Sequence, residues 1–431
     1  MAVPLLPRPT FLSSSSFSSF GSNSSSSSSF SDAAASTADA SPMTSSLPRS
    51  GGGNDQWKAL AVLRDHPGSV TCLSLCGEFL LSASTGADIV AWQQPDLRRF
   101  ARFGGHHHGV SEGSVKALAA SGGRVFSAHQ DGRVRVWRVS RRPGSENAFK
   151  LVAALPTPRD VLGRIFRQAS YDAVHPARGG HRHRRRLWIE HADSISCLAV
   201  HDGALYSGSW DKTLKVWRVA DLKCVESIRA HDDAVNAVAV DGAGGVIYSA
   251  AADGKVKAWE KGKAAHFLQA VLVARDGVSW NALVVTVDRR VYAAGSDGHV
   301  VGWDRLGSKA AVRWTLVCDV KAHDMAVLCL SVTAGDMLCT GSADKTIGLW
   351  RRHAGGEITK LGVVRGHEGP VKCLQAAWCR VSNGCMVYSG SLDKTIRVWW
   401  VPNDLGRNEQ QKQGKCCNDQ DQNDKPCVFL R

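Results

Sequence analysis

The chain has 431 residues, of which 43% are hydrophobic, 7% aromatic and 21% charged, and its formal net charge is +14. This length allows one large domain with tails. No apolar run approaches the roughly 18 residues that a membrane-spanning helix needs, so the composition excludes a membrane protein of that kind and predicts a soluble one.

The first 56 residues are rich in serine and alanine and contain five charged residues. Such a segment cannot bury enough apolar surface to fold, and we predict a disordered tail over residues 1–56. A serine-rich, acid-poor start is also typical of plastid transit peptides. Because only two of the five charges are basic, the disordered tail is the preferred interpretation.

From residue 57 to residue 402 the sequence repeats one phrase, clearest in residues 206–217 and 388–399. The phrase ends in a tryptophan seven times, at intervals of 42 to 49 residues except for one of 80. A period of this length, with a Gly-His start and a Trp end, is typical of the four-stranded blades of a propeller. We therefore predict an all-β protein, a seven-bladed WD40 β-propeller spanning residues 57–402.

Each blade of this type contains a buried polar relay. A His before the first strand, a Ser or Thr on the second, an Asp in the following turn and the Trp of the third can satisfy one another's buried polar atoms. Four blades contain the whole set, which we call the structural tetrads: His191, Ser207, Asp211, Trp217; His231, Ser249, Asp253, Trp259; His323, Thr340, Asp344, Trp350; and His367, Ser389, Asp393, Trp399.

The other three blades lack part of the set. Gly86 stands where the first blade should have its Asp, and Ser111 replaces the His of the second. The fifth blade has Asp276 for His and Ala293 for Ser.

A His, Asp and Ser together also describe a hydrolase triad. Four copies at blade spacing indicate a structural role, whereas a nucleophile needs one exposed copy beside an oxyanion hole. The sequence has no phosphate loop, metal-binding helix or nucleophile elbow. His106–His108 lacks partners at ligand spacing, and we predict a loop there. We expect no enzyme activity, cofactor or metal.

The ends of the ring are also predicted. Residues 57–63 match the outer strand at 224–230 but have no earlier strands of their own. We expect them to pair with the last blade after Trp399, which closes the ring and leaves no long unpaired edge.

The 13 cysteines show no metal-type pairing. One position of the first strand is a cysteine in four blades, as Cys72, Cys197, Cys329 and Cys373. This pattern indicates small buried core residues in a protein of a reducing compartment.

The long interval, residues 138–190, predicts a basic insertion between blades 2 and 3, with twelve Arg or Lys against four acids. Thr157, Pro158 and an acid in the first turn predict the start of a helix. The apolar stripe that follows is interpreted as packing on the propeller rim, with a partner-docking helix as the alternative; it contains Val161, Leu162, Ile165 and Phe166.

A dense basic patch follows, formed by Arg178, Arg182, Arg184, Arg185 and Arg186. Three interpretations stay open: a nuclear import signal, a patch for nucleic acid or another polyanion, and a solvated loop. No aromatic residues are interleaved with the arginines, so sequence-specific nucleic-acid binding is not supported. Residues 403–431 form a second polar tail, predicted to be disordered, with five basic and five acidic residues.

Partner contacts are expected beside the turn aspartates, because these turns open toward one face of a propeller and such loops carry function. The candidates are Gln130, Trp210, Ser296 and Leu392, with Asp193 and Asp233 as acidic candidates two residues beyond their blade histidines. Trp210 is preferred since Trp is enriched among binding hot spots. The alternatives are packing against a neighbouring blade for Trp210 and ordinary solvated acids for the two aspartates.

Several segments, among them 187–198, 206–218 and 224–236, resemble the JINGUBANG family of plant WD-repeat proteins. The resemblance covers roughly residues 57–401. It implies a non-enzymatic regulator of plant development, associated with pollen germination and growth, that acts through transcription-factor partners. We expect a monomeric propeller located in the nucleus or cytoplasm. Two other functions stay open: a substrate receptor of a cullin-type ubiquitin ligase, whose Trp-Asp-x-Arg motif ends in Leu306 here, and an RNA or polyanion binder. A plastid location is the minor alternative.

Overall fold

The computed structural model describes residues 57–105, 113–140, 148–165, 187–308, 311–333, 335–379, 384–403 and 405. The predictions for the N-terminal tail, for His106–His108, for Ser111, for the arginine patch and for the C-terminal tail beyond residue 405 lie outside these residues. Within the described part, no helix is long and apolar enough to cross a membrane.

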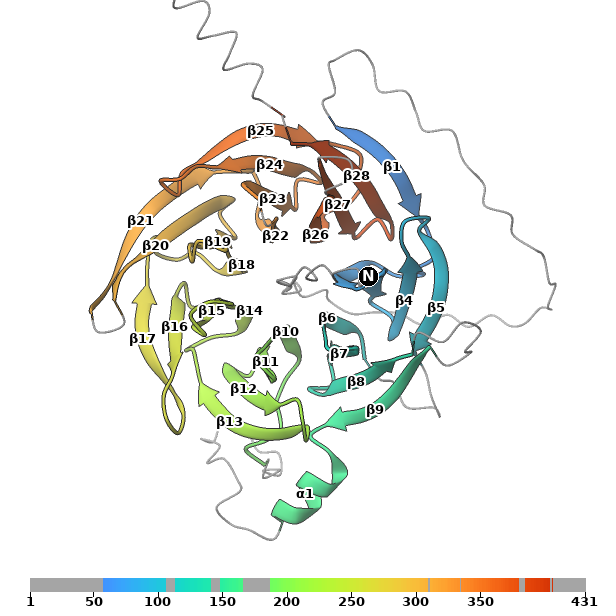
Figure 1. The fold of residues 1–431 in the computed structure, drawn as a ribbon, viewed down its shortest axis with the longest axis vertical. Coiled ribbons are helices and arrows are strands. Elements are labelled where there is room, and N and C mark those ends of the chain that lie inside the picture. Colours follow the sequence, from blue (N-terminus) through green and yellow to red (C-terminus); the bar gives the residue numbers. More distant parts are fainter. Residues whose placement is uncertain are drawn as a thin grey trace, which may run out of the picture.

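Seven four-stranded antiparallel sheets are arranged as blades around a central axis, which confirms the predicted all-β, seven-bladed propeller (Figure 1). Blade 1 contains β2 (Val70–Cys76), β3 (Phe79–Ser84), β4 (Asp88–Gln93) and β5 (Arg98–Gly104). Blade 2 contains β6 (Val115–Ser121), β7 (Arg124–His129), β8 (Val134–Val139) and β9 (Phe149–Leu155). Blade 3 contains β10 (Ile195–His201), β11 (Ala204–Ser209), β12 (Thr213–Arg218) and β13 (Lys223–Arg229).

The remaining blades follow the same order, with the last one completed from the N-terminal side. Blade 4 contains β14 (Val235–Val240), β15 (Ile247–Ala251), β16 (Val256–Lys261) and β17 (His266–Leu272). Blade 5 contains β18 (Trp280–Val285), β19 (Val291–Gly295), β20 (His299–Ser308) and β21 (Ala311–Lys321). Blade 6 contains β22 (Val327–Val332), β23 (Met337–Ser342), β24 (Ile347–Arg352) and β25 (Ile358–Val364). Blade 7 contains β26 (Val371–Cys379), β27 (Gly384–Ser391), β28 (Ile396–Pro402) and β1 (Lys58–Leu63).

Blade 7 joins the two ends of the ring. β1 pairs with β28 in antiparallel register, from Lys58 opposite Trp400 to Leu63 opposite Ile396. The strand order is therefore β1-β28-β27-β26, with the N-terminal strand outermost. This pairing covers the backbone edge of β28 that would otherwise be open to another chain.

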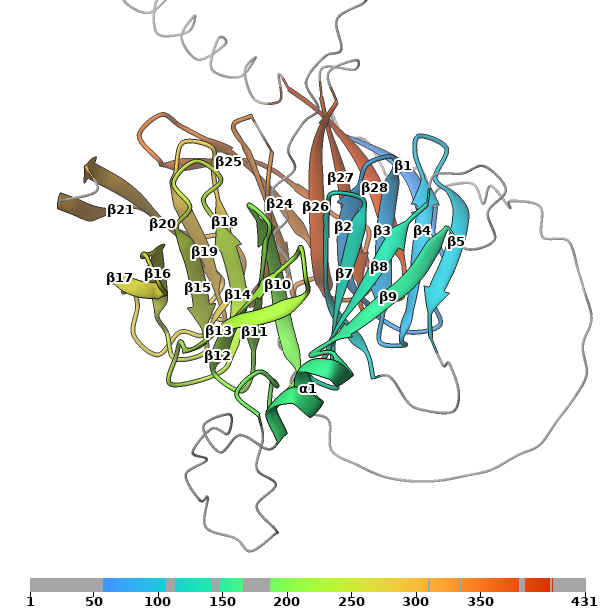
Figure 2. The ribbon, with the colours of Figure 1, turned by 60° about the horizontal axis from the view of Figure 1, so that its bottom comes forward.

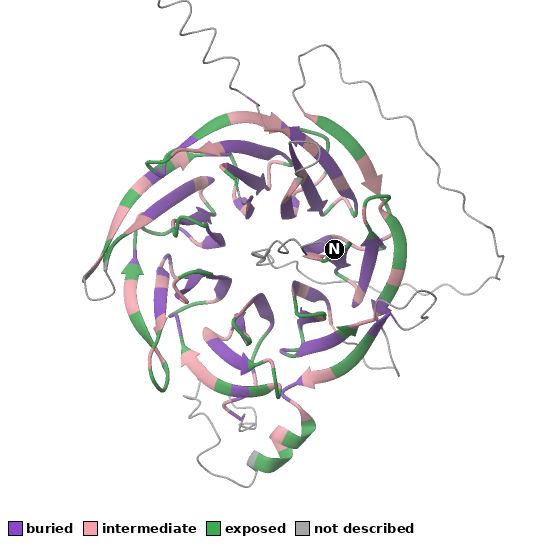
Figure 3. Ribbon diagram, in the orientation of Figure 1, coloured by how far each residue is buried: buried purple, intermediate pink, exposed green. Residues whose placement is uncertain are grey.

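The hydrophobic core is divided among the interfaces between blades. Three inner strands of each blade are largely buried, whereas most residues of the outer strands are exposed or half-buried (Figure 3). Each repeat tryptophan packs against the preceding blade: Trp137 lies in one cluster with Leu81 of blade 1, and Trp92 lies in another with Val398 of blade 7. Stacking neighbours thus buries faces that one blade cannot bury alone.

Part of the predicted insertion belongs to the propeller. β9, within the interval 138–190, is the outer strand of blade 2 and pairs with β8 from Val134 opposite Leu155 to Val139 opposite Phe149. The predicted boundary was therefore wrong at its N-terminal side, and the insertion begins after Leu155. The strand was missed because β9 is followed by a helix rather than by the Gly-His of the next repeat.

The helix α1 (Pro158–Ile165) begins where the sequence predicts and lies outside the ring beside blades 2 and 3 (Figure 1, Figure 2). Thr157 caps it: its Oγ1 accepts a hydrogen bond from the Asp160 N–H at 3.3 Å and donates one to the Asp160 carboxylate at 2.6 Å. Val161 packs against the core between the two blades. Leu162, by contrast, is 63% exposed, whereas Phe166 of the predicted stripe lies outside the described residues.

Candidate partner-binding face

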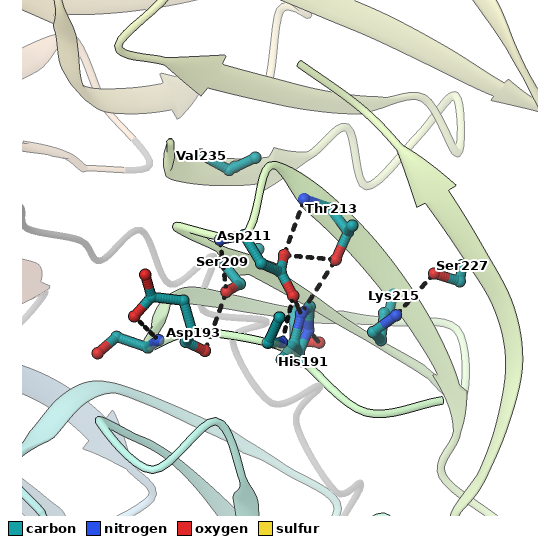
Figure 4. A network of polar contacts seen from close by, with 12 residues as sticks. His191, Asp193, Ser209, Asp211, Thr213, Lys215, Ser227 and Val235 are labelled. Atoms are coloured by element: carbon teal, nitrogen blue, oxygen red, sulfur yellow. Dashed lines mark hydrogen bonds and ion pairs between the residues drawn. The ribbon is translucent and has the colours of Figure 1, made fainter. Parts of the chain in front are cut away.

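The four structural tetrads are present as hydrogen-bonded sets. In blade 3, His191 Nδ1 lies 3.0 Å from the Asp211 carboxylate (Figure 4). The Nε2 of the same ring lies 2.8 Å from Ser207 Oγ. The Trp217 indole N–H donates to Ser207 Oγ at 2.9 Å. The other three sets repeat the arrangement, with His-to-hydroxyl distances of 2.7 to 2.8 Å and His-to-carboxylate distances of 2.7 to 2.9 Å.

The aspartate of each set also holds two loops together. Asp211 accepts hydrogen bonds from the backbone N–H of Ala192 at 2.7 Å and of Thr213 at 2.9 Å. Burial alone would raise the pKa of Asp211, but His191 and these donors hold the pKa well below its usual range. The hydroxyl of Ser207 is fully buried, so this arrangement can position loops but cannot reach a substrate.

Blade 1 has the relay without its carboxylate. His66 Nε2 lies 2.7 Å from Ser82 Oγ, which also accepts the Trp92 indole N–H at 2.8 Å. With Gly86 in the turn, His66 Nδ1 is buried and has no hydrogen-bond partner among the described residues. Burial and, next, the charge of Arg102 lower the pKa of His66 to about 4.

Blade 2 obtains its histidine from an unexpected place. His129 lies two residues after Ser127 on the same strand, and its Nε2 is 2.8 Å from Ser127 Oγ. The Trp137 indole N–H donates to the same hydroxyl at 2.9 Å. Asp131 instead contacts Arg135 at 2.9 Å. The blade spacing pointed to Ser111 and missed His129, although a His beside the strand Ser was the signal available in the sequence.

Blade 5 replaces the histidine by an arginine. Arg275, next to the predicted Asp276, donates from Nε to Asp297 at 2.7 Å and from a guanidinium N–H to Asp319 at 2.9 Å. Ala293 offers no hydroxyl, and Trp303 packs edge-on against Trp280 with ring centroids 6.0 Å apart. The turn is thus anchored by an ion pair.

The predicted contact residues lie at equivalent positions on one end of the ring. The position is the residue just before the turn aspartate, or before its replacement. In all seven blades its backbone N–H donates to a carbonyl just before the innermost strand, at 2.9 to 3.1 Å. Gln130, Ser296 and Leu392 are exposed there. Their backbones are fixed by the blade, whereas their side chains are available at the surface. We call this end of the ring the turn face.

Trp210 is half-buried at the turn face. The Lys116 ammonium of the neighbouring blade lies 5.7 Å from the centroid of its ring, a cation–π contact. Its buried indole N–H has no hydrogen-bond partner among the described residues. The ring therefore packs on a neighbouring blade and keeps part of its surface exposed, and contact with a partner stays a prediction.

The two acidic candidates are exposed but locally engaged. Asp193 accepts a hydrogen bond from the backbone N–H of Ser194 at 2.6 Å, and Asp233 accepts one from Ala234 at 2.8 Å. Each carboxylate thus shapes its own turn and retains an exposed surface.

The comparisons with known proteins agree with this architecture. The model of the WD domain, G-beta repeat, matches residues 184–218, 222–260, 314–351 and 358–399. The chain is 30% identical over 171 residues to small ribosomal subunit protein RACK1y of Oryza sativa subsp. japonica, covering 37% of this chain and 48% of that protein. It is 23% identical over 270 residues to the ribosome biogenesis protein WDR12 homolog of Chlamydomonas reinhardtii, covering 50% and 57%.

A further plant relative is protein ROOT INITIATION DEFECTIVE 3 of Arabidopsis thaliana. It is 24% identical over 237 residues, covering 53% of this chain and 46% of that protein. In these three relatives the match spans less than two thirds of the relative's own length. Together with the seven-bladed ring and its tetrads, these matches show that the chain belongs to the WD40-repeat proteins.

Proposed function

We propose that this protein is a non-enzymatic scaffold that binds a protein partner on the turn face, with Trp210 as the main contact. The observation that carries the proposal is the position of Trp210, a half-buried aromatic ring on a turn fixed by the hydrogen bonds of Asp211. Binding energy concentrates in aromatic residues at such partly enclosed, rigid positions. Leu392, 42% exposed, and Met325, 54% exposed, add apolar surface from blades 7 and 6.

The finer part of the proposal comes from the resemblance to the JINGUBANG family. It makes the partner a transcription factor, the process the control of plant development, including pollen germination and growth, and the compartment the nucleus or cytoplasm. A scaffold of this kind acts by holding a partner in place, and the WD40 fold is well suited to that role because its turns sit on a closed, stacked ring.

The proposal is tested by purification of the full chain from plant tissue together with what it binds. Trp210→Ala is compared with the intact chain and with Phe267→Ala, which removes an aromatic side chain, 51% exposed, from the outer strand β17. We expect a partner that is retained by the intact chain and by the Phe267 variant and lost from the Trp210 variant. The same set of proteins on all three would refute the turn face as the site.

A second candidate is an RNA or polyanion binder, favoured by the net charge of +14 and by the similarity to a ribosomal subunit protein. Neutralising the five arginines between residues 178 and 186 should then flatten the fall of affinity for RNA with salt concentration. An unchanged slope would reject it. The ubiquitin-ligase alternative is disfavoured, because Asp304 of its incomplete motif lies in β20 and pairs with Arg290 at 3.3 Å.

A further inference from the structure

Blade 5 has a longer outer hairpin than the other blades (Figure 1). β20 has 10 residues and β21 has 11, whereas the longest other strand of the described part, β26, has 9. In the added length Arg305 stands opposite Trp314, and Leu306 stands opposite Arg313. Residues directly opposite each other on neighbouring strands point to the same face of a sheet, and successive residues of one strand point to opposite faces. Arg305 and Trp314 therefore share one face, and Arg313 belongs to the other.

The face that carries Arg305 lies against blade 4. The Trp314 ring meets the Tyr248 ring of β15 edge-on, with the ring centroids 5.7 Å apart. Arg305 reaches the connection between β14 and β15, because a Cβ added to Gly244 would lie 3.4 Å from Arg305 Nη1. The same Cβ would lie 2.4 Å from Asp241 Oδ2. The guanidinium group and the carboxylate thus come close to one point of this connection.

A second arginine reaches the same carboxylate from the turn before β19. Arg289 Nε lies 3.8 Å from Asp241 Oδ2, and its side chain is 51% exposed, whereas Asp241 is buried. The carboxylates of Asp288 and Asp304 are engaged elsewhere, since they pair with Arg290 at 2.6 and 3.3 Å. We call the resulting group the junction site; it contains Asp241, Tyr248, Arg289, Arg305 and Trp314.

Three buried polar atoms of the junction site have no hydrogen-bond partner among the described residues: Asp241 Oδ2, the Tyr248 hydroxyl and the Trp314 indole nitrogen. Tyr248 is fully buried. At the next junction the equivalent hydroxyl is satisfied, because Tyr292 donates to the Gly356 carbonyl at 2.7 Å. Buried polar groups without a partner are rare and costly. The junction between blades 4 and 5 therefore holds donors for which the described part of the fold provides no acceptor.

The junction site has more positive than negative charge. Two guanidinium groups share one carboxylate, whose Oδ1 already accepts the Ala243 N–H at 2.9 Å. A carboxylate from outside would supply the one missing negative charge. It would also bring two oxygens with about four acceptor positions, and the planar guanidinium group matches this geometry. Burial raises the pKa of Tyr248, so its hydroxyl keeps its proton at neutral pH and is able to donate.

We propose that the junction site binds a carboxylate, either the acidic side chain of a protein segment or a free carboxylate anion. Arg289 and Arg305 supply the positive charge and the outer donors, and Trp314 and Tyr248 supply the inner donors. The two inner polar atoms are covered in the structure, so an arginine side chain has to turn when the carboxylate enters. Such side-chain rotations are common on binding. The site lies at the end of the ring opposite the turn face and does not depend on a partner at Trp210.

The chain offers a substitution that removes a donor and little else. Tyr248→Phe deletes a hydroxyl without a partner, so we expect this variant to be no less stable than the intact chain when no carboxylate is added. A clearly lower Tm would show that the hydroxyl is already satisfied and would overturn the proposal. Arg305→Gln removes one charge from the site. Its matched control is Arg313→Gln, on the other face of the same hairpin.

The measurement is the Tm of the full chain against sodium acetate, at constant ionic strength set with chloride. We expect a saturable rise in Tm for the intact chain and for Arg313→Gln, and a loss of that rise for Arg305→Gln. For Tyr248→Phe the half-saturating acetate concentration should increase about tenfold, as expected when a hydrogen bond to a charged group is lost. The same rise in all four proteins would refute the junction site.

Two capped tripeptides, Gly-Asp-Gly and Gly-Asn-Gly, distinguish the sources of the carboxylate. A rise in Tm with the aspartate peptide, but not with its asparagine twin, shows that an acidic side chain is sufficient. A rise with acetate alone assigns the site to the free anion. No rise of the intact chain with acetate or with the aspartate peptide would overturn the proposal, and so would an equal rise with the asparagine twin.

Discussion

The carboxylate of Asp253 provides the sharpest test of how the tetrads stabilise the ring. It accepts hydrogen bonds from His231 Nδ1 at 2.9 Å and from the backbone N–H groups of Asp232 and Lys255, both at 3.1 Å. Replacement by Asn leaves one carbonyl oxygen for these three donors and places an NH₂ group against another. Leaving a buried donor unsatisfied costs about 1 to 3 kcal/mol, and we expect Asp253→Asn to lower the free energy of unfolding by that amount at pH 7.

The pH dependence follows from the same contacts. Burial alone would raise the pKa of Asp253, but the hydrogen bond and charge of His231 and the backbone donors lower the pKa to about 2. The folded pKa lies below the unfolded value near 3.9, so this stabilisation is full above about pH 4 and is lost as the pH falls through about 2. Discounted for water at the turn, it amounts to about 1 to 2 kcal/mol.

Urea unfolding of the full chain, followed by tryptophan fluorescence at pH 7 and at pH 2.5, measures both effects. The gap between the intact chain and Asp253→Asn should shrink at the lower pH, because the intact carboxyl is then becoming protonated. Asp233→Asn is the control: this carboxylate is exposed and, among the described residues, accepts a hydrogen bond from the backbone N–H of Ala234, so we expect less than about 0.5 kcal/mol. Equal stability of Asp253→Asn and Asp233→Asn at pH 7 would refute the reasoning.

Three further changes test other parts of the fold. Gly86→Asp should give His66 its missing carboxylate, raise the pKa of His66 and stabilise the ring by about 1 kcal/mol. The site has room, because a Cβ at Gly86 would meet only Ser84 Oγ at 3.6 Å and a backbone nitrogen at 4.0 Å. A Tm no higher than that of Gly86→Ala would contradict this expectation. Deletion of residues 1–63 removes β1 and should lower Tm and cause aggregation, whereas deletion of residues 1–52 should not; equal melting and light scattering would reject the closure. Lys215→Met removes a buried ammonium that donates to the Trp188 carbonyl at 2.6 Å, so hydrogen exchange at Leu187–Glu190 should rise severalfold, and unchanged exchange would reject this role.

The tetrads could be found from sequence because buried polar atoms need partners, and the same four residue types recur at one spacing. His129 could not be found in this way, since it satisfies Ser127 from the same strand and breaks the spacing. The outer strand β9 was hidden because a helix follows it. Trp210 could be placed on a turn, but its contact with Lys116 depends on how neighbouring blades meet.

The innermost strands illustrate a second limit, because those of blades 1, 2 and 7 each have a β-bulge at the second residue. Thr71, Lys116 and Lys372 stand at the same position of the repeat, which an alignment can reveal. That this position is the extra residue of a bulge, aimed at the next blade, depends on strand register, and register is set by the packing of the whole ring. The sequence alone therefore does not distinguish the two lysines from ordinary strand residues.

The central claim, that a partner binds through Trp210, is tested most directly by the dissociation constant of the partner retained in the purification experiment. We would measure it by titration calorimetry at fixed salt, for the intact chain, Trp210→Ala and Phe267→Ala. Loss of a hot-spot side chain costs about 2 kcal/mol or more, so the account predicts at least tenfold weaker binding for the Trp210 variant and unchanged binding for the Phe267 variant. Equal dissociation constants for the intact chain and Trp210→Ala would contradict it.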